Sequence, residues 1–210
     1  MRRTLTALAA AALALPCVAH AQARYDEPRF IEPEEKAGPK MTLGVMGEIG
    51  LDDYARDLNH DVDAGVGYGA RVDLSPSRNF GLELGYHGAV NNMNDKLTSD
   101  GRLITNQFGG DLRINVVPPD RDLPGQLRPY VFGGAYYHRV DTDNFTPGVR
   151  DDINAFALPV GLGLDANIGK GFLIGGRFGY NFLFNEVDKF NGRNADYWTA
   201  TLNLGTRLGR

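Results

Sequence analysis

Hydrophobic and polar residues alternate along residues 171–185, which read Gly-Phe-Leu-Ile-Gly-Gly-Arg-Phe-Gly-Tyr-Asn-Phe-Leu-Phe-Asn. Six apolar side chains share one parity: Phe172, Ile174, Phe178, Tyr180, Phe182 and Phe184. The other parity carries small or polar residues at Gly175, Arg177, Gly179, Asn181 and Asn185. Successive side chains of a strand point to opposite faces, so the pattern predicts one strand with an apolar face and a polar face. Its length far exceeds the usual five or six residues or so and is typical of a strand that crosses a membrane.

The same alternation recurs from Met41 onward and predicts eight strands. Their ranges are 41–53, 64–75, 79–91, 103–117, 127–140, 153–168, 171–186 and 197–209. The connections at 75–79 and 169–171 are tight turns rich in turn-forming residues, and the connection at 117–126 is a longer exception on the same side. The other four, near 54–63, 92–102, 141–152 and 187–196, are polar and mostly longer. Alternating turns and long loops predict an all-β fold, an eight-stranded antiparallel up-and-down transmembrane β-barrel over residues 41–210.

The apolar faces of these strands are expected to point outward, toward lipid. About forty apolar side chains lie on them, which would overfill the interior of an eight-stranded barrel. An arginine facing lipid near the bilayer midplane costs roughly 2–4 kcal/mol, so the charged parity is expected inside. In the fifth strand the same reasoning assigns the outer wall to Tyr130, Phe132, Tyr136 and Val140.

Aromatic residues near the strand ends predict two girdles at the membrane interfaces. The residues on the side of the short turns are Phe80, Tyr130 and Phe172. Those on the side of the long loops are Tyr54, Phe156, Phe184 and Trp198.

The inward parity carries charges of both signs. Its polar members are Glu48, Arg71, Asp73, Glu83, His87, Gln107, Asp111, Arg113, Arg139, Asp165, Arg177 and Asn181. Unpaired charges would be costly in a narrow lumen, so we expect a polar network in which they pair with one another. The predicted network consists of Glu48, Arg71, Asp73, Glu83, Asp111, Arg113, Asp165 and Arg177. Two interpretations remain open: a salt-bridged plug, or a thin water-filled pore lined by the same residues.

Residues 1–21 have the three parts of a secretory signal peptide, namely a basic start, an apolar stretch and the small-residue cleavage site Ala19-His20-Ala21. Residues 22–40 are charged and rich in proline, which predicts a flexible periplasmic tail. The single cysteine, Cys17, lies within the signal, and acylation there is the alternative to plain cleavage.

Beyond the signal the chain has no cysteine, which excludes disulfides and thiolate metal sites. We expect no cofactor and no metal site. Without Arg2 and Arg3 the chain carries 20 basic and 26 acidic residues. That acidic balance, with no basic stripe, argues against a nucleic-acid partner.

The last predicted strand resembles the C-terminal signal that the barrel-assembly machinery reads in outer-membrane proteins. Asn203, Gly205 and Leu208 match its polar, glycine and hydrophobic positions, whereas Arg210 stands where an aromatic residue, most often Phe, is usual. With the eight strands, this resembles the OmpA/OmpX-type small outer-membrane β-barrel family over residues 41–210. The resemblance implies a monomer in the outer membrane of a Gram-negative bacterium, in contact with membrane lipid and lipopolysaccharide. The periplasmic domain of OmpA proteins has no counterpart here, so its peptidoglycan-binding role is not implied.

We expect a structural or surface-interaction role without enzymatic activity. The first alternative is a narrow porin-like channel for small solutes. A lipid-modifying enzyme is a second, with His138 near the loop side as its candidate residue. A soluble lipocalin-like carrier is the third, and the sidedness of the strands argues against it.

The first long loop contains Asp57-x-Asn59-x-Asp61-x-Asp63, which resembles the start of an EF-hand calcium loop. Val62 and Tyr68 stand where the motif requires glycine and glutamate. A solvated acidic loop is therefore favoured over a calcium site.

Overall fold

The computed structural model describes residues 41–93, 101–116, 125–143, 152–169, 171–184 and 195–208. The predicted signal peptide and tail lie outside these residues. The strands are β1 (Thr42–Tyr54), β2 (Gly65–Ser75), β3 (Phe80–Asn92), β4 (Arg102–Asn115), β5 (Leu127–Asp143), β6 (Asp152–Asn167), β7 (Phe172–Phe184) and β8 (Tyr197–Leu208). A 3-10 helix, η1 (Arg56–Leu58), follows β1. The eight predicted strands are confirmed, and the largest difference in a boundary is at the end of β5.

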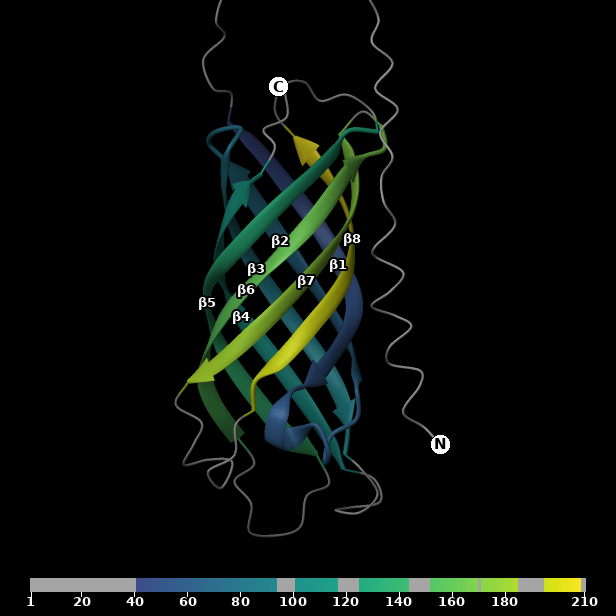
Figure 1. The fold of residues 1–210 in the computed structure, drawn as a ribbon, viewed down its shortest axis with the longest axis vertical. Coiled ribbons are helices and arrows are strands. Elements are labelled where there is room, and N and C mark those ends of the chain that lie inside the picture. Colours follow the sequence, from purple (N-terminus) through teal and green to yellow (C-terminus); the bar gives the residue numbers. More distant parts are fainter. Residues whose placement is uncertain are drawn as a thin grey trace, which may run out of the picture. The chain divides into compact units, whose positions relative to one another are not determined.

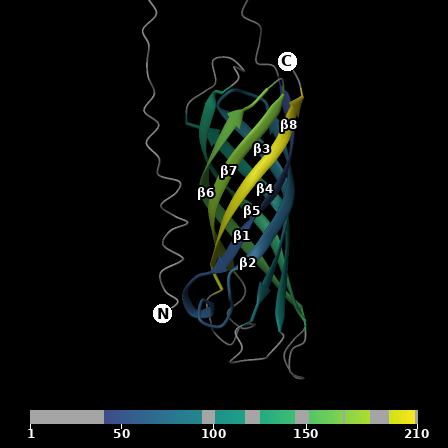
Figure 2. The ribbon, with the colours of Figure 1, turned by 90° about the vertical axis from the view of Figure 1, so that its right-hand side faces the viewer.

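The strands form a closed barrel in which every neighbouring pair is antiparallel and β8 pairs with β1 (Figures 1 and 2). Following paired residues once around the barrel from Leu43 leads back to β1 at Asp53, ten residues further along. Such a stagger requires the strands to tilt against the barrel axis, as Figure 1 shows. The predicted fold class is confirmed.

The two ends of the barrel differ in their connections. We call the end with the β2–β3 and β6–β7 connections, at 76–79 and 168–171, the turn end. The opposite end, where β1 leads into η1 and then β2, is the loop end.

The outer wall is apolar along seven strands, with the predicted parity facing out. Exposed side chains of that parity include Ile49, Val66, Leu84, Phe108, Leu162, Phe178 and Leu204. Among the described residues, no helix is long and apolar enough to cross a membrane.

Strand β5 faces the other way from the prediction. Tyr130, Phe132, Tyr136 and Val140 are buried inside the barrel, and Tyr137 is exposed outside. The prediction was wrong because it assigned the more aromatic face of the strand to lipid, whereas these rings fit inside the barrel against glycines of β6.

Glycines on β6 make the space that the β5 rings fill. A Cβ added to Gly163 would lie 2.2 Å from Cζ of Tyr130, and one added to Gly161 would lie 2.5 Å from Cζ of Phe132. Real Cβ atoms do not approach that closely, so each ring occupies the volume that a side chain at the glycine would need.

The inverted strand changes several residue assignments. Tyr130 is inside and not in the turn-end girdle, and Arg139 is outside and not in the lumen. Tyr54, at the end of β1, is also buried inside and not in the loop-end girdle. The other predicted girdle residues lie on the outer wall: Phe80, Phe156, Phe172 and Phe184 are exposed, and Trp198 is partly exposed.

An apolar cluster fills the lumen at the loop end. It comprises Tyr54, Leu58, Val62, Leu103, Tyr136, Val140, Ala155, Ala157, Leu183, Ala195 and Tyr197. Leu58 and Val62 come from the segment after β1, which folds over the mouth of the barrel, and Val62 pairs with Met93. We call this cluster the apolar cap.

Candidate functional site

The middle of the lumen holds a cluster of arginines around one carboxylate, Glu83. Nη1 of Arg71 and Nη1 of Arg113 each lie 3.4 Å from a Glu83 oxygen, and Arg177 also donates to Glu83. These side chains come from β2, β3, β4 and β7, so the cluster ties together strands from different sides of the barrel. The Glu83 side chain is completely buried.

Each of the three arginines has a second carboxylate partner. Arg71 pairs with Glu48 at 3.2 Å and Arg113 pairs with Asp165 at 2.6 Å. Arg177 pairs with Asp111. We call these seven residues the charge network: Glu48, Arg71, Glu83, Asp111, Arg113, Asp165 and Arg177.

Asp73, the eighth residue of the predicted network, lies apart from it in a separate ion pair. It binds Arg207 of β8 at 3.0 Å and accepts a hydrogen bond from Ser75 at 2.8 Å. The structure therefore brings seven of the eight predicted residues into one network and places Asp73 in a second pair nearer the turn end.

The β5 aromatics take part in the charge network, which the sequence reasoning missed. The guanidinium of Arg113 lies 3.6 Å above the Tyr130 ring centroid, and that of Arg177 lies 3.3 Å above the Phe132 centroid. Tyr136 donates its hydroxyl to Asp111 at 2.9 Å. Cation–π contacts of this kind stabilise a desolvated guanidinium by about 2 kcal/mol.

His87 extends the polar contacts toward the loop end. Its Nδ1 lies 3.0 Å from Glu48 and its Nε2 lies 2.8 Å from Asp52. Two ionised carboxylates can both accept only from an imidazolium, so this arrangement suits a protonated His87. His87 links Asp52 to the charge network through Glu48.

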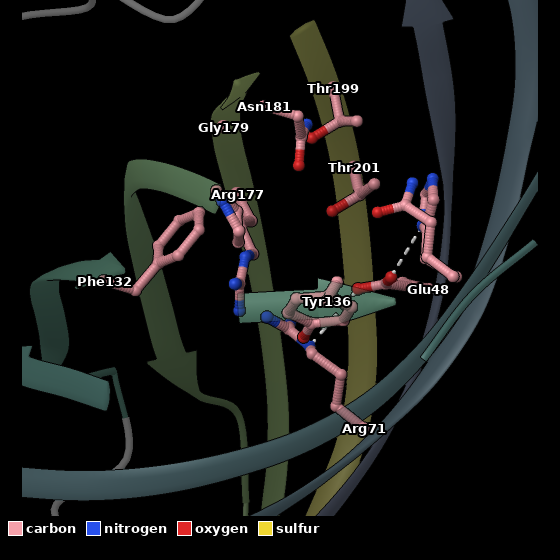
Figure 3. A pocket seen from close by; sticks show the side chains of 12 residues that line it. Glu48, Arg71, Phe132, Tyr136, Arg177, Gly179, Asn181, Thr199 and Thr201 are labelled. Carbon is pink, nitrogen blue, oxygen red and sulfur yellow. Dashed lines mark hydrogen bonds and ion pairs between the residues drawn. The ribbon is translucent and has the colours of Figure 1, made fainter. Parts of the chain in front are cut away.

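A small cavity of about 40 Å³ lies beside Arg177 and is lined in part by Glu48 and Arg71 (Figure 3) and by His87. Thr199, Thr201 and Asn181 also line it. A volume of this size holds one or a few waters, since one probe sphere needs roughly 10–15 Å³.

His138 lies on the inner wall close to the apolar cap. It has no exposed surface, neither ring nitrogen has a hydrogen-bond partner, and its ring centroid is 5.5 Å from that of Tyr197. The candidate residue for lipid chemistry is thus enclosed and not exposed at the rim. Within the described ranges, no group of three His, Cys, Asp or Glu side chains is placed to hold a metal ion.

The lumen is therefore occupied at two levels, by the charge network and by the apolar cap. The outer wall carries exposed apolar side chains on all eight strands. A closed antiparallel barrel that is apolar outside and polar inside is the architecture of a transmembrane β-barrel.

Comparisons with known proteins agree with this class. The family model for the outer membrane protein β-barrel domain matches residues 6–207, so the chain belongs to that family. A comparison with curated protein sequences found no match.

Solved structures share the fold at low sequence identity. The N-terminal barrel of Pseudomonas aeruginosa OprF is 17% identical with a TM-score of 0.53, covering 79% of this chain and 97% of that one. Neisserial surface protein A is 14% identical with a TM-score of 0.52, covering 79% and 96%. Ail, the attachment invasion locus protein of Yersinia pestis, is 12% identical with a TM-score of 0.51, covering 81% and 99%. Family and fold together indicate a location in a Gram-negative outer membrane.

Proposed function

We propose that this protein is an outer-membrane barrel with a structural or surface-interaction role, whose lumen is closed to free diffusion. The observation that carries the proposal is the charge network, in which three arginines and four carboxylates from six strands form ion pairs with one another across the lumen. Charged groups that bind each other tightly are poorly placed to guide a passing solute.

The energetics favour a closed lumen. Breaking a buried ion pair by removing one partner costs about 3–5 kcal/mol, and a water-filled path through the network would have to separate several pairs together. The apolar cap adds a second barrier in series, since its buried aliphatic side chains offer water no hydrogen bonds.

A narrow channel is the second candidate, and the cavity beside Arg177 favours it. If waters fill this cavity and connect to both ends, small solutes could follow. A closed lumen and a narrow channel differ in whether the charge network and the apolar cap open at the same time.

Swelling of proteoliposomes in solutions of small sugars tests the proposal. Vesicles with the wild-type chain are expected to swell no faster than empty vesicles. Glu83→Gln alone should stay closed because the cap remains, and Leu58→Ser with Val62→Ser should stay closed because the network remains. Only the triple variant, with Glu83→Gln, Leu58→Ser and Val62→Ser together, should admit sugar. Swelling of the wild-type vesicles would contradict the proposal and favour the channel.

A surface role requires the loop end to face the medium. Asn59 is exposed near η1, and Arg78 is exposed in the β2–β3 turn. In intact cells, a membrane-impermeant maleimide should label Asn59→Cys and leave Arg78→Cys unlabelled until the cells are broken. Labelling of Arg78→Cys alone would reverse the orientation and remove the basis for a surface role.

A further inference from the structure

His138 is a histidine enclosed within the apolar cap. On the inner face of β5 it lies between Tyr136 and Val140, and it pairs with Ala155 of β6; all three neighbours belong to the cap. None of its surface is exposed, and neither Nδ1 nor Nε2 has a hydrogen-bond partner. Buried polar side chains nearly always have a partner, so a histidine without one calls for a physical explanation.

The surroundings of His138 do not stabilise a positive charge on its ring. Its ring centroid lies 5.5 Å from that of Tyr197, and the residue paired with it on β4 is the uncharged Gln107. His87 of β3 acts on it as a like charge, and Asp52 of β1 is bound to His87 at 2.8 Å. The buried ionisable side chains at this end of the lumen are Asp52, Tyr54, His87, Tyr136, Asp196 and Tyr197. Among the described residues, an imidazolium at position 138 would therefore have no carboxylate to pair with.

The segment that covers the mouth can leave the cap without breaking the barrel. We call this segment, residues 55–63, the lid; it lies between β1 and β2, outside the eight strands. Backbone hydrogen bonds of Ala55 and Asp63 fix its two ends to the barrel. Between these ends, the buried side chains of Leu58 and Val62 hold it against the lumen. Release of the lid therefore costs mainly apolar contacts and leaves the strand pairing of the closed barrel in place.

We propose that His138 is an acid-sensitive switch, which releases the lid from the loop-end mouth when its imidazole takes up a proton. A neutral imidazole is tolerated among the apolar side chains of the cap, whereas an imidazolium needs water or a counter-charge. Release of the lid lets water reach the ring. It also relieves the left-handed backbone at Arg56, whose φ of 58° is unfavourable for a residue other than glycine. The proton comes from the medium, and its loss at higher pH lets the lid close again.

The direction of the pH dependence follows from which form accepts the proton. In the open form water surrounds the ring, and a hydrated imidazole titrates near pH 6.5 or so. In the closed form nothing pairs with the added charge, so the proton binds preferentially to the open form. Above that pH both forms are neutral and the lid stays closed. Each unit of pH below it raises the ratio of open to closed lids by up to about tenfold.

The inference rests on the proposed closed lumen and adds a condition under which one of its two barriers opens. The charge network contains no histidine, so uptake of a proton by His138 leaves its ion pairs in place. Acid thus exposes the loop-end part of the lumen, with Leu58 and Val62 as new apolar surface, while the network still blocks the middle.

Pulsed EPR distance measurements on the full chain in lipid vesicles test the switch. Spin labels are placed at Asn59→Cys on the lid and at Arg78→Cys at the turn end, with Cys17→Ser to leave no other thiol. We expect one distance at pH 8 and a second population below about pH 6.5, whose ratio to the first rises up to about tenfold per unit of pH. His138→Phe keeps a ring in the cap but takes up no proton, so it should give a single distance from pH 8 to pH 5.

His60→Gln is the matched control, because His60 is an exposed histidine on the lid itself. Its response to acid should equal that of the wild type. His138→Leu is a second apolar replacement, expected to behave like His138→Phe. Heat-modifiable gel migration verifies that every variant is folded.

Three results would overturn the inference: an undiminished second population in a folded His138→Phe or His138→Leu variant, a single distance for the wild type down to pH 5, or loss of the response in His60→Gln. Failure of the proposed function is visible separately. Swelling of wild-type vesicles in sugar at pH 8 would contradict the closed lumen, whereas a lid that stays closed at pH 5 contradicts only this inference.

Discussion

Replacement of Glu83 by glutamine is the sharpest perturbation of the charge network. Glu83 contacts three arginines, more than any other carboxylate of the network. Glutamine keeps the volume of the side chain but removes its charge and turns one acceptor into a donor, which faces the N–H groups of the arginines.

The magnitude follows from which contacts survive. A hydrogen bond to a charged group contributes about 1.5–3 kcal/mol, so three lost contacts could total about 5–9 kcal/mol. Each arginine keeps its second carboxylate, Glu48, Asp111 or Asp165, which reduces the loss. We therefore expect Glu83→Gln to lower the free energy of unfolding by about 3–5 kcal/mol, the usual cost of breaking a buried pair.

Urea unfolding in lipid vesicles, followed by the fluorescence of Trp198, measures this loss. Trp198 is the only tryptophan, and it lies on the outer face of β8. Asp73→Asn is the control, because Asp73 pairs with one arginine, the partly exposed Arg207, and should cost about 2 kcal/mol. A loss for Glu83→Gln no larger than that for Asp73→Asn would refute the argument that Glu83 holds the three arginines together.

Two further substitutions test how the inner wall is packed. Gly163→Ala should destabilise the barrel by about 1–3 kcal/mol in the same urea assay, because its Cβ would collide with the Tyr130 ring. Gly169→Ala, with nothing within 4 Å, should leave stability nearly unchanged, and equal effects would contradict the packing. Phe132→Leu should cost about 2 kcal/mol or more by removing the ring beneath Arg177, and an unchanged unfolding midpoint would show that this cation–π contact is worth little.

The eight strands could be predicted from the sequence, and so could the outward face of seven of them, because each position on a strand faces either lipid or the lumen. A lipid-facing residue must be apolar, and alternation makes that requirement visible in the sequence. Arg177 is an example: glycines and asparagines share its parity in β7, and the structure places it inside.

Strand β5 could not be predicted in this way, because both of its faces are partly apolar. Its inner face carries aromatics that stack on Arg113 and Arg177, and this arrangement depends on glycines of the neighbouring β6. The sequence contains the relevant signal, the alternating glycines Gly161 and Gly163, but the fit of rings against glycines involves two neighbouring strands. A prediction made strand by strand cannot use it.

The apolar cap was not predicted for a related reason. Leu58 and Val62 lie in a polar loop segment, and their burial depends on how that segment folds back over the mouth. In η1, Arg56 has a φ of 58°, a backbone conformation that a non-glycine residue rarely adopts. Neither the turn nor its direction is encoded in an alternating pattern.

Single-channel recording in planar bilayers tests most directly whether the lumen is closed. The wild-type chain, once its insertion has been verified, is expected to show no steady open level at either polarity. A stable, reproducible open level for the wild-type chain would contradict a lumen closed by the charge network and the apolar cap.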